Sequence, residues 1–171
     1  MVREGVCMRI REMAFLVSLG VCICAHGVAQ APLQPVQWKV SLAFSGAVKQ
    51  GSTSIIELSA TIQDGWHVYG LVQQPGGPTP LRVALGENVV AQSAGEPSGS
   101  APIKKHDPSF DLDTQIYAYS LSLHVPIQVR ANAPAGTRGI PISVRFQACS
   151  GQICLPPRTV HVSAPIEVLG Q

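Results

Sequence analysis

The amino-acid sequence predicts an all-β domain, an antiparallel β-sandwich of the immunoglobulin-like type. The chain has 171 residues, of which 46% are hydrophobic, so it can bury the core of one domain. Its 16 glycines and 14 prolines are typical of short strands joined by turns. Apolar residues alternate with polar ones in several segments, without the helical period of about 3.6 residues. A jelly roll or a small barrel is the alternative architecture.

The first element is a secretory leader over residues 1–31. Arginines precede an apolar run at residues 14–25, and small residues follow at 27–31. A basic segment, an apolar core of about a dozen residues and a small-residue cleavage site are typical of a cleavable signal peptide. Spanning a bilayer needs about 20 apolar residues, which disfavours an uncleaved anchor. We therefore expect an exported domain over residues 32–171 with no membrane span.

The alternating segments give the expected strands of this domain. They cover residues 36–44, 56–62, 66–69, 81–85, 117–125, 140–148 and one or two strands from residue 160. The dipeptide Asp64-Gly65 is a turn signal between the second and third strands. Residues 73–80 are expected to form a loop, and the polar, proline-broken residues 91–111 a long surface excursion. Long ordered loops in compact domains often have a function.

Composition and motifs exclude several function classes. Charged residues make up 13% and the formal net charge is +2, which gives no basic footprint for nucleic acid. The sequence has no Gly-x-Ser-x-Gly elbow, no telling pair of carboxylates and no phosphate-binding glycine loop. Hydrolase and nucleotide-binding functions are therefore disfavoured.

Cys149 and Cys154 are the two cysteines outside the leader, and they are the reactive centre of the expected domain. Four residues separate them, and Ser150-Gly151 is a turn signal, so a hairpin would bring them to disulfide distance. The apolar residues of 142–148 share one face of their strand, which puts Cys149 on the opposite face. There it would be accessible to an attacking thiolate unless another segment covers it.

The residues alone leave the role of the pair open. A structural disulfide is common in exported domains. Closing so short a loop stabilises by roughly 2 kcal/mol, against about 4.7 kcal/mol for a hundred-residue loop, which weakens that explanation. A non-catalytic binding module with such a disulfide is therefore one alternative to a redox-active pair.

A copper-handling module is a second alternative, because two thiolates and an imidazole can bind copper. The candidate histidines are His67, His106, His124 and His161. They show no ligand-type clustering, and the domain after the leader has no methionine, a frequent soft ligand for copper in exported proteins.

The sequence around the cysteines resembles the N-terminal periplasmic domain of the DsbD family of thiol:disulfide interchange proteins, or protein-disulfide reductases. The matching string is Phe-Gln-Ala-Cys at residues 146–149 and Cys-Leu-Pro-Pro at 154–157, followed by Thr159-Val160. A second match is the Asp-Gly-aromatic-x-x-Tyr segment at residues 64–69. A third is Phe110, which stands seven residues before Tyr117, at the offset of the family's cap-loop phenylalanine. Together the matches span residues 36–168.

The resemblance implies an immunoglobulin-like periplasmic domain whose cysteine pair passes electrons, with no organic cofactor and no metal. It implies that Cys154 forms a transient mixed disulfide with the partner and that Cys149 resolves it. Phe110 would shield the pair, and Tyr69 and His67 would lie beside it and tune or shield it. The implied partners are thioredoxin-like periplasmic proteins, such as disulfide isomerases and cytochrome c maturation thioredoxins, and a membrane electron donor. We expect a monomer.

Three positions and the length depart from the family pattern. The gap of four residues between the cysteines is shorter than in several members. Pro108-Ser109 replace the acidic residues that often precede the cap phenylalanine, with Asp107 further back, and His67 stands where an aromatic residue can sit. The family proteins continue into a membrane domain and a thioredoxin-like domain, whereas this sequence ends at Gln171. Electrons are therefore expected to be received and delivered in trans.

Overall fold

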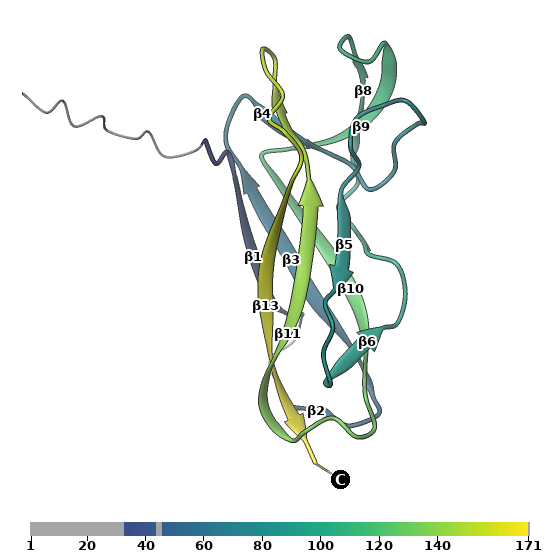
Figure 1. The fold of residues 1–171 in the computed structure, drawn as a ribbon, viewed down its shortest axis with the longest axis vertical. Helices are drawn as coiled ribbons and strands as arrows, with labels where there is room; N and C mark the ends of the chain where they lie inside the picture. Colours follow the sequence, from purple (N-terminus) through teal and green to yellow (C-terminus); the bar gives the residue numbers. More distant parts are fainter. Residues whose placement is uncertain (1–32, 44–45, 171) are drawn as a thin grey trace, which may run out of the picture. The chain divides into compact units, whose positions relative to one another are not determined.

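The computed structural model describes residues 33–43 and 46–170, and all the regular elements in them are β-strands (Figure 1). They form three sheets, of which two pack face to face and share one core. The expectation of an all-β sandwich is therefore confirmed. The predicted leader lies outside the described residues, among which there is no helix able to span a membrane.

The first sheet is entirely antiparallel and is built around a long central pair of strands. In spatial order its strands are β1 (Val36–Leu42), β3 (Thr53–Ile62), β10 (Ser120–Val129) and β6 (Ala91–Ser93), with β7 (Ser98–Gly99) also paired to β10. Alternate residues of β3 are buried, among them Ile56, Leu58 and Ile62. The period of two in the sequence thus places one face of this sheet on the core.

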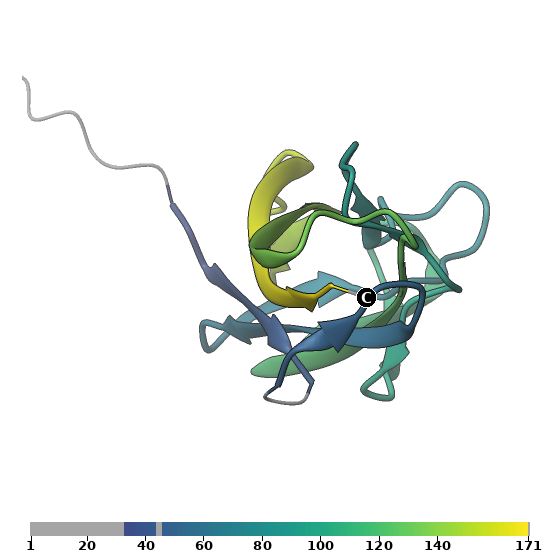
Figure 2. The same cartoon turned by 90° about the horizontal axis from the view of Figure 1, so that it is seen from below.

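The second sheet covers that face, and Figure 2 shows the two sheets as separate layers. Its strands are β2 (Val48–Lys49), β13 (Arg158–Leu169), β11 (Gly136–Phe146) and β5 (Arg82–Leu85). The β11–β13 pair runs unbroken from Gly136↔Val168 to Phe146↔Arg158. Between the layers, the rings of Trp38 and Phe146 lie 5.3 Å apart.

The third sheet extends the sandwich at one end, the upper end in Figure 1. Its strands are β12 (Ala148–Ser150), β4 (Trp66–Tyr69), β9 (Leu112–Ala118) and β8 (Ile103–Asp107). It is continuous with the sandwich, because β11 passes into β12 at Gln147 and β9 passes into β10 at Tyr119. Tyr119 has a φ of 65°, a left-handed conformation that turns the chain from one sheet to the other.

Most expected strands are present. Residues 91–111 are mostly exposed, as the predicted surface excursion requires, but they are not without regular structure. They contain β6, β7 and β8. Each of these strands pairs with a single neighbour at a sheet edge, and the first four residues of β8 are exposed. Edge strands of this kind have little apolar alternation, so the sequence pattern does not reveal them. The expected loop at residues 73–80 contains no strand, as predicted.

Truncation of Leu58, which is fully buried between the two main sheets, should destabilise the domain strongly. We expect Leu58→Ala to lower the free energy of unfolding by about 2–5 kcal/mol, because it leaves a cavity in a close-packed core. Urea unfolding measures this loss. The control is Leu169→Ala, where the side chain is 43% exposed and the loss should be within about 0.5 kcal/mol. Equal losses in the two variants would contradict the assigned core.

Candidate functional site

The two cysteines form a disulfide at the end of the hairpin that joins β12 to β13. Cys149 and Cys154 face each other as an isolated antiparallel bridge, with their Cα atoms 4.0 Å apart. The turn is closed by the amide of Ser150, which donates to the carbonyl of Ile153 at 2.8 Å. The Ser150 hydroxyl in turn accepts from the amide of Ile153 at 3.1 Å. The predicted hairpin is therefore confirmed.

The two sulfur-bearing residues differ sharply in exposure. Cys149 is only 1% exposed, whereas Cys154 is exposed. Cys149 does not join the main core; it packs in a separate cluster with Tyr69 and Ile116, against which Phe110 also lies. The prediction that Cys149 leaves the core face is thus confirmed, and the covering segments are β4, β9 and the turn after β8. An attacking group can reach Cys154 from solvent, but not Cys149.

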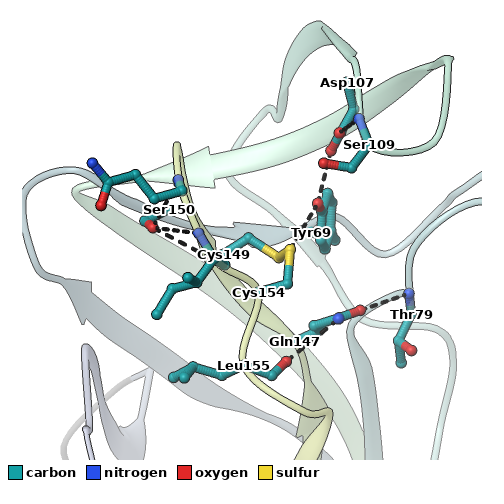
Figure 3. Close-up of a disulfide and its surroundings, with 11 residues drawn as sticks. Tyr69, Thr79, Asp107, Ser109, Gln147, Cys149, Ser150, Cys154 and Leu155 are labelled. Atoms are coloured by element: carbon teal, nitrogen blue, oxygen red, sulfur yellow. Dashed lines mark hydrogen bonds between the residues drawn. A yellow bond between two sulfur atoms is a disulfide. The ribbon is translucent and has the colours of Figure 1, made fainter.

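Tyr69 connects the disulfide to a buried carboxylate (Figure 3). Its hydroxyl donates a hydrogen bond of 2.7 Å to Oδ2 of Asp107, and it lies 4.0 Å from Sγ of Cys154. The other carboxylate oxygen, Oδ1, accepts from the backbone amide of Ser109 at 2.9 Å. Sequence reasoning did not select Asp107 as a site residue. The one signal for it was an acidic residue three positions before Phe110.

These contacts set the protonation states of Tyr69 and Asp107. Burial raises the pKa of Tyr69, and the hydrogen bond to ionised Asp107 raises it further, so the phenol keeps its proton. Burial alone would raise the pKa of Asp107, but the hydrogen bonds from Tyr69 and Ser109, with the charge of His67, outweigh it. The net pKa of Asp107 lies below its ordinary value. A neutral phenol and an ionised carboxylate therefore stand beside the disulfide.

His67 lies on β4, the strand that pairs with the cysteine-bearing β12. In the pairing of β12 with β4 it is directly opposite Cys149, and its ring meets that of Tyr69 edge-on at 5.2 Å. Burial lowers the pKa of His67; the charge of Asp107 opposes this shift and that of Lys105 adds to it. A cavity of about 340 Å³ opens here, and its lining includes His67, Tyr69, Lys105, Asp107 and both cysteines.

Phe110 lies in the turn between β8 and β9, at the same end of the domain as the cysteine hairpin. It is half-buried, and its ring stands edge-on to that of Tyr69 at 6.1 Å. The structure thus brings all five residues selected from the sequence into one region.

Gln147 fixes the base of the cysteine hairpin, a contact that sequence reasoning did not predict. Its side-chain amide donates to the carbonyl of Leu155 at 3.4 Å, and its Oε1 accepts from the amide of Thr79 at 3.2 Å (Figure 3). The residue therefore joins the two arms of the hairpin to the loop at 73–80.

The histidines considered for copper are spread over the fold. His106 lies near Asp111 and Asp113 at 3.6 and 3.5 Å, while His124 is on β10 and His161 on β13. Residues 33–43 and 46–170 contain no group of three or more histidine, cysteine or acidic side chains that could hold a metal ion.

The family comparison agrees with this site. The model of the family described as "Thiol:disulfide interchange protein DsbD, N-terminal" matches residues 33–165. The chain belongs to the DsbD N-terminal family. That match covers β1 to most of β13, including the cysteine hairpin and the third sheet. A comparison with curated protein sequences finds no match.

Among solved structures, the chain is similar to the N-terminal periplasmic domain of ScsB from Proteus mirabilis, with a TM-score of 0.52 and 12% identity. The similarity covers 81% of this chain and 49% of that one, so this chain spans about half of the ScsB domain. At this identity the likeness concerns the fold alone. A family 123 glycoside hydrolase from Clostridium perfringens overlaps with a TM-score of 0.34 and 8% identity, over 78% of this chain and 27% of that one.

The Tyr69–Asp107 bond makes the stability of the domain depend on pH in the acid range. Because the pKa of Asp107 is depressed in the folded state, its ionised form stabilises the fold above the ordinary value of 3.8. That contribution is lost as the pH falls through the folded-state pKa. We expect Asp107→Asn to cost about 1 kcal/mol at pH 7, with the difference from the unaltered protein shrinking as the pH falls. Urea unfolding over an acid pH series measures this.

The control for this prediction is Asp111→Asn, because the Asp111 side chain is 96% exposed. Its unfolding free energy should follow that of the unaltered protein at every pH. A constant difference between Asp107→Asn and the unaltered protein down to the lowest pH would show that Asp107 is not the titrating group.

Proposed function

We propose that this domain exchanges disulfides with thioredoxin-like proteins in the periplasm and passes electrons through the Cys149–Cys154 pair. Membership of the DsbD N-terminal family supports a thiol–disulfide exchange module. The observation that carries the proposal is the asymmetry of the disulfide: Cys154 is exposed, whereas Cys149 is buried, with 1% of its surface exposed. Such a pair has one sulfur for the partner and one for resolution.

The chemistry follows from that asymmetry. In the step that reduces the oxidised domain, a partner thiolate attacks Sγ of Cys154 along the disulfide axis. The electron pair of the broken S–S bond leaves on Sγ of Cys149. The second thiolate of the partner then attacks its own sulfur in the mixed disulfide and releases Cys154. The partner becomes a disulfide, and the domain gains two electrons and, once both sulfurs are protonated, two protons. Delivery of electrons is the reverse sequence.

The proposed partners are thioredoxin-like periplasmic proteins and a membrane electron donor, both met in trans by a monomeric domain. The proposal includes the periplasmic setting and the cleavable leader predicted over residues 1–31; it is supported by the family match and by the periplasmic ScsB domain of similar fold. Cytochrome c maturation proteins are one class of recipient.

Phe110 and Tyr69 are proposed to shield the pair until a partner docks. Both rings pack in the cluster that covers Cys149, and Phe110 lies on the short turn at residues 108–111 rather than on a strand. A turn can move with the loss of few contacts, which suits a shield that must open.

A structural disulfide is the second candidate function, and the burial of Cys149 beside Tyr69 and Ile116 favours it. In that case the disulfide would fix the third sheet to the sandwich, and the domain would bind partners without exchange. The two candidate functions differ in whether the Cys149–Cys154 disulfide opens during function.

Single cysteine variants test the proposed function by trapping. Cys149→Ser leaves Cys154 free to attack the disulfide of an oxidised thioredoxin-like protein but removes the resolving thiol, so a mixed disulfide should accumulate. Cys154→Ser should form none, since Cys149 is buried. Non-reducing electrophoresis with mass spectrometry detects the product, and urea unfolding checks that both variants are folded.

The structural candidate would prevail if Cys149→Ser formed no mixed disulfide and the unaltered pair had a reduction potential below about −300 mV. Known exchange proteins lie above that, at roughly −270 mV or higher.

Removal of the Phe110 ring tests the shield. We expect Phe110→Ala to be reduced several-fold faster by a small dithiol, because loss of the ring opens Cys149 to attack in addition to the already exposed Cys154. The appearance of free thiols over time, measured by alkylation, gives the rate of reduction. The control is Val89→Ala, an exposed residue outside the site, whose rate should not change. An unchanged rate in Phe110→Ala would exclude a shielding role.

A further inference from the structure

His67 is placed to exchange a proton with Cys149. The two residues are directly opposite each other in the antiparallel pairing of β4 with β12, so their side chains project to the same face. In such a pair the Cβ atoms lie about 4.5–5.5 Å apart. Both residues also line the cavity of about 340 Å³ beside the disulfide. The register and the shared cavity therefore place the imidazole of His67 beside Cys149, on the same face of the sheet.

Cys149 needs a base supplied by the protein. To resolve a mixed disulfide on Cys154, the thiol of Cys149 must become a thiolate, because the thiol itself is a poor nucleophile. Cys149 is 1% exposed, so bulk water has little access to take its proton, and burial disfavours the charged form. A neighbouring group that accepts the proton removes this obstacle.

The other titratable groups around the cavity are unsuited to that task. Tyr69 holds its proton in the hydrogen bond to Asp107. The hydrogen bonds from Tyr69 and Ser109 stabilise ionised Asp107 and lower its pKa, which makes it too weak a base for a thiol. Lys105 as an ammonium ion has no lone pair to offer. His106 lines the cavity, but its two ring nitrogens lie 3.6 and 3.5 Å from carboxylate oxygens of Asp111 and Asp113.

His67 has the required protonation state. Burial lowers the pKa of His67 below its ordinary value of 6.5, the positive charge of Lys105 adds to this, and the negative charge of Asp107 partly offsets it. At neutral pH the ring is therefore mostly neutral and one nitrogen can accept a proton.

We propose that His67 is the general base that activates Cys149 in the resolving step. This proposal rests on the proposed function of the pair. The proton of the Cys149 thiol passes to an imidazole nitrogen of His67, and the thiolate attacks Sγ of Cys154 in the mixed disulfide. The Cys149–Cys154 bond forms, the bond between Cys154 and the partner breaks, and its electron pair leaves on the partner's sulfur. The imidazolium then releases its proton to solvent. In the reverse direction it protonates the departing Cys149 thiolate.

A small aromatic disulfide, dithiobis-nitrobenzoate, isolates this step without a protein partner. The reduced domain releases one coloured nitrothiobenzoate when exposed Cys154 attacks, and a second when Cys149 resolves the mixed disulfide. Stopped-flow absorbance separates the two phases. We expect His67→Gln to slow the second phase about a hundredfold and to leave the first unchanged, a factor typical of general base catalysis. The control, His161→Gln, replaces an exposed histidine on β13 and should change neither phase.

The pH profile supplies a readout that a structural role would not produce. In the unaltered protein the rate of the second phase should rise through a step below pH 6.5, as His67 loses its proton. In His67→Gln this step should vanish, leaving a rate that rises only as the thiol itself ionises. A second phase of unaltered rate in His67→Gln would overturn the proposal, and so would a profile of the unaltered protein without that step.

The result for the second phase in His67→Gln can be told apart from the result of the cysteine trapping experiment. Loss of the step in His67→Gln supports the base role even if no thioredoxin-like protein forms a mixed disulfide, in which case only the proposed function fails. Conversely, a trapped mixed disulfide in Cys149→Ser together with an unaltered second phase in His67→Gln would support the function and refute the base.

Discussion

The pairing of the short strand β12 with β4 is the constraint on which the rest of the site depends. The long β11–β13 pair carries the chain to the end of the sandwich, and at Gln147 the strand leaves that pair and joins the third sheet. The change of partner puts Ala148 on the main core and Cys149 on the opposite face, towards His67 and Tyr69. Without this change of strand partner, the disulfide would lie on a surface hairpin with both sulfurs in solvent.

That constraint explains why the two sulfurs have different environments. The bridge is closed across a four-residue turn, so Cys154 lies on the outward arm of the hairpin and is exposed, while Cys149 lies on the arm that is paired to β4. Burial then acts on one sulfur only. A disulfide with one reachable sulfur directs an incoming thiolate to Cys154, because attack requires access along the bond axis. In the proposed function, strand pairing therefore decides which sulfur meets the partner.

Sequence reasoning reached the fold class, the cysteine hairpin and the face on which Cys149 lies, because each depends on local period or spacing. The alternation over residues 142–148 and the Ser150-Gly151 turn suffice for these predictions. It missed β8 and the role of Asp107, which depend on contacts over long separations. Tyr69 and Asp107 are 38 positions apart, and only the pairing of β4, β9 and β8 in one sheet brings them together.

The separation of the site from the main core has a further consequence under the proposed function, in which the disulfide opens and closes. The residues around the disulfide, Tyr69, Ile116 and Cys149 with Phe110, form a cluster distinct from the large core that holds the two main sheets together. Breaking the S–S bond moves the two sulfurs apart and requires these side chains to repack. Because the cluster is small and lies on short strands and a turn, that repacking disturbs few contacts, although Val68, Tyr117 and Ala148 of the same strands belong to the main core. The two main sheets can keep their packing while the small cluster adapts, so under the proposed function the oxidised and reduced forms would share one fold.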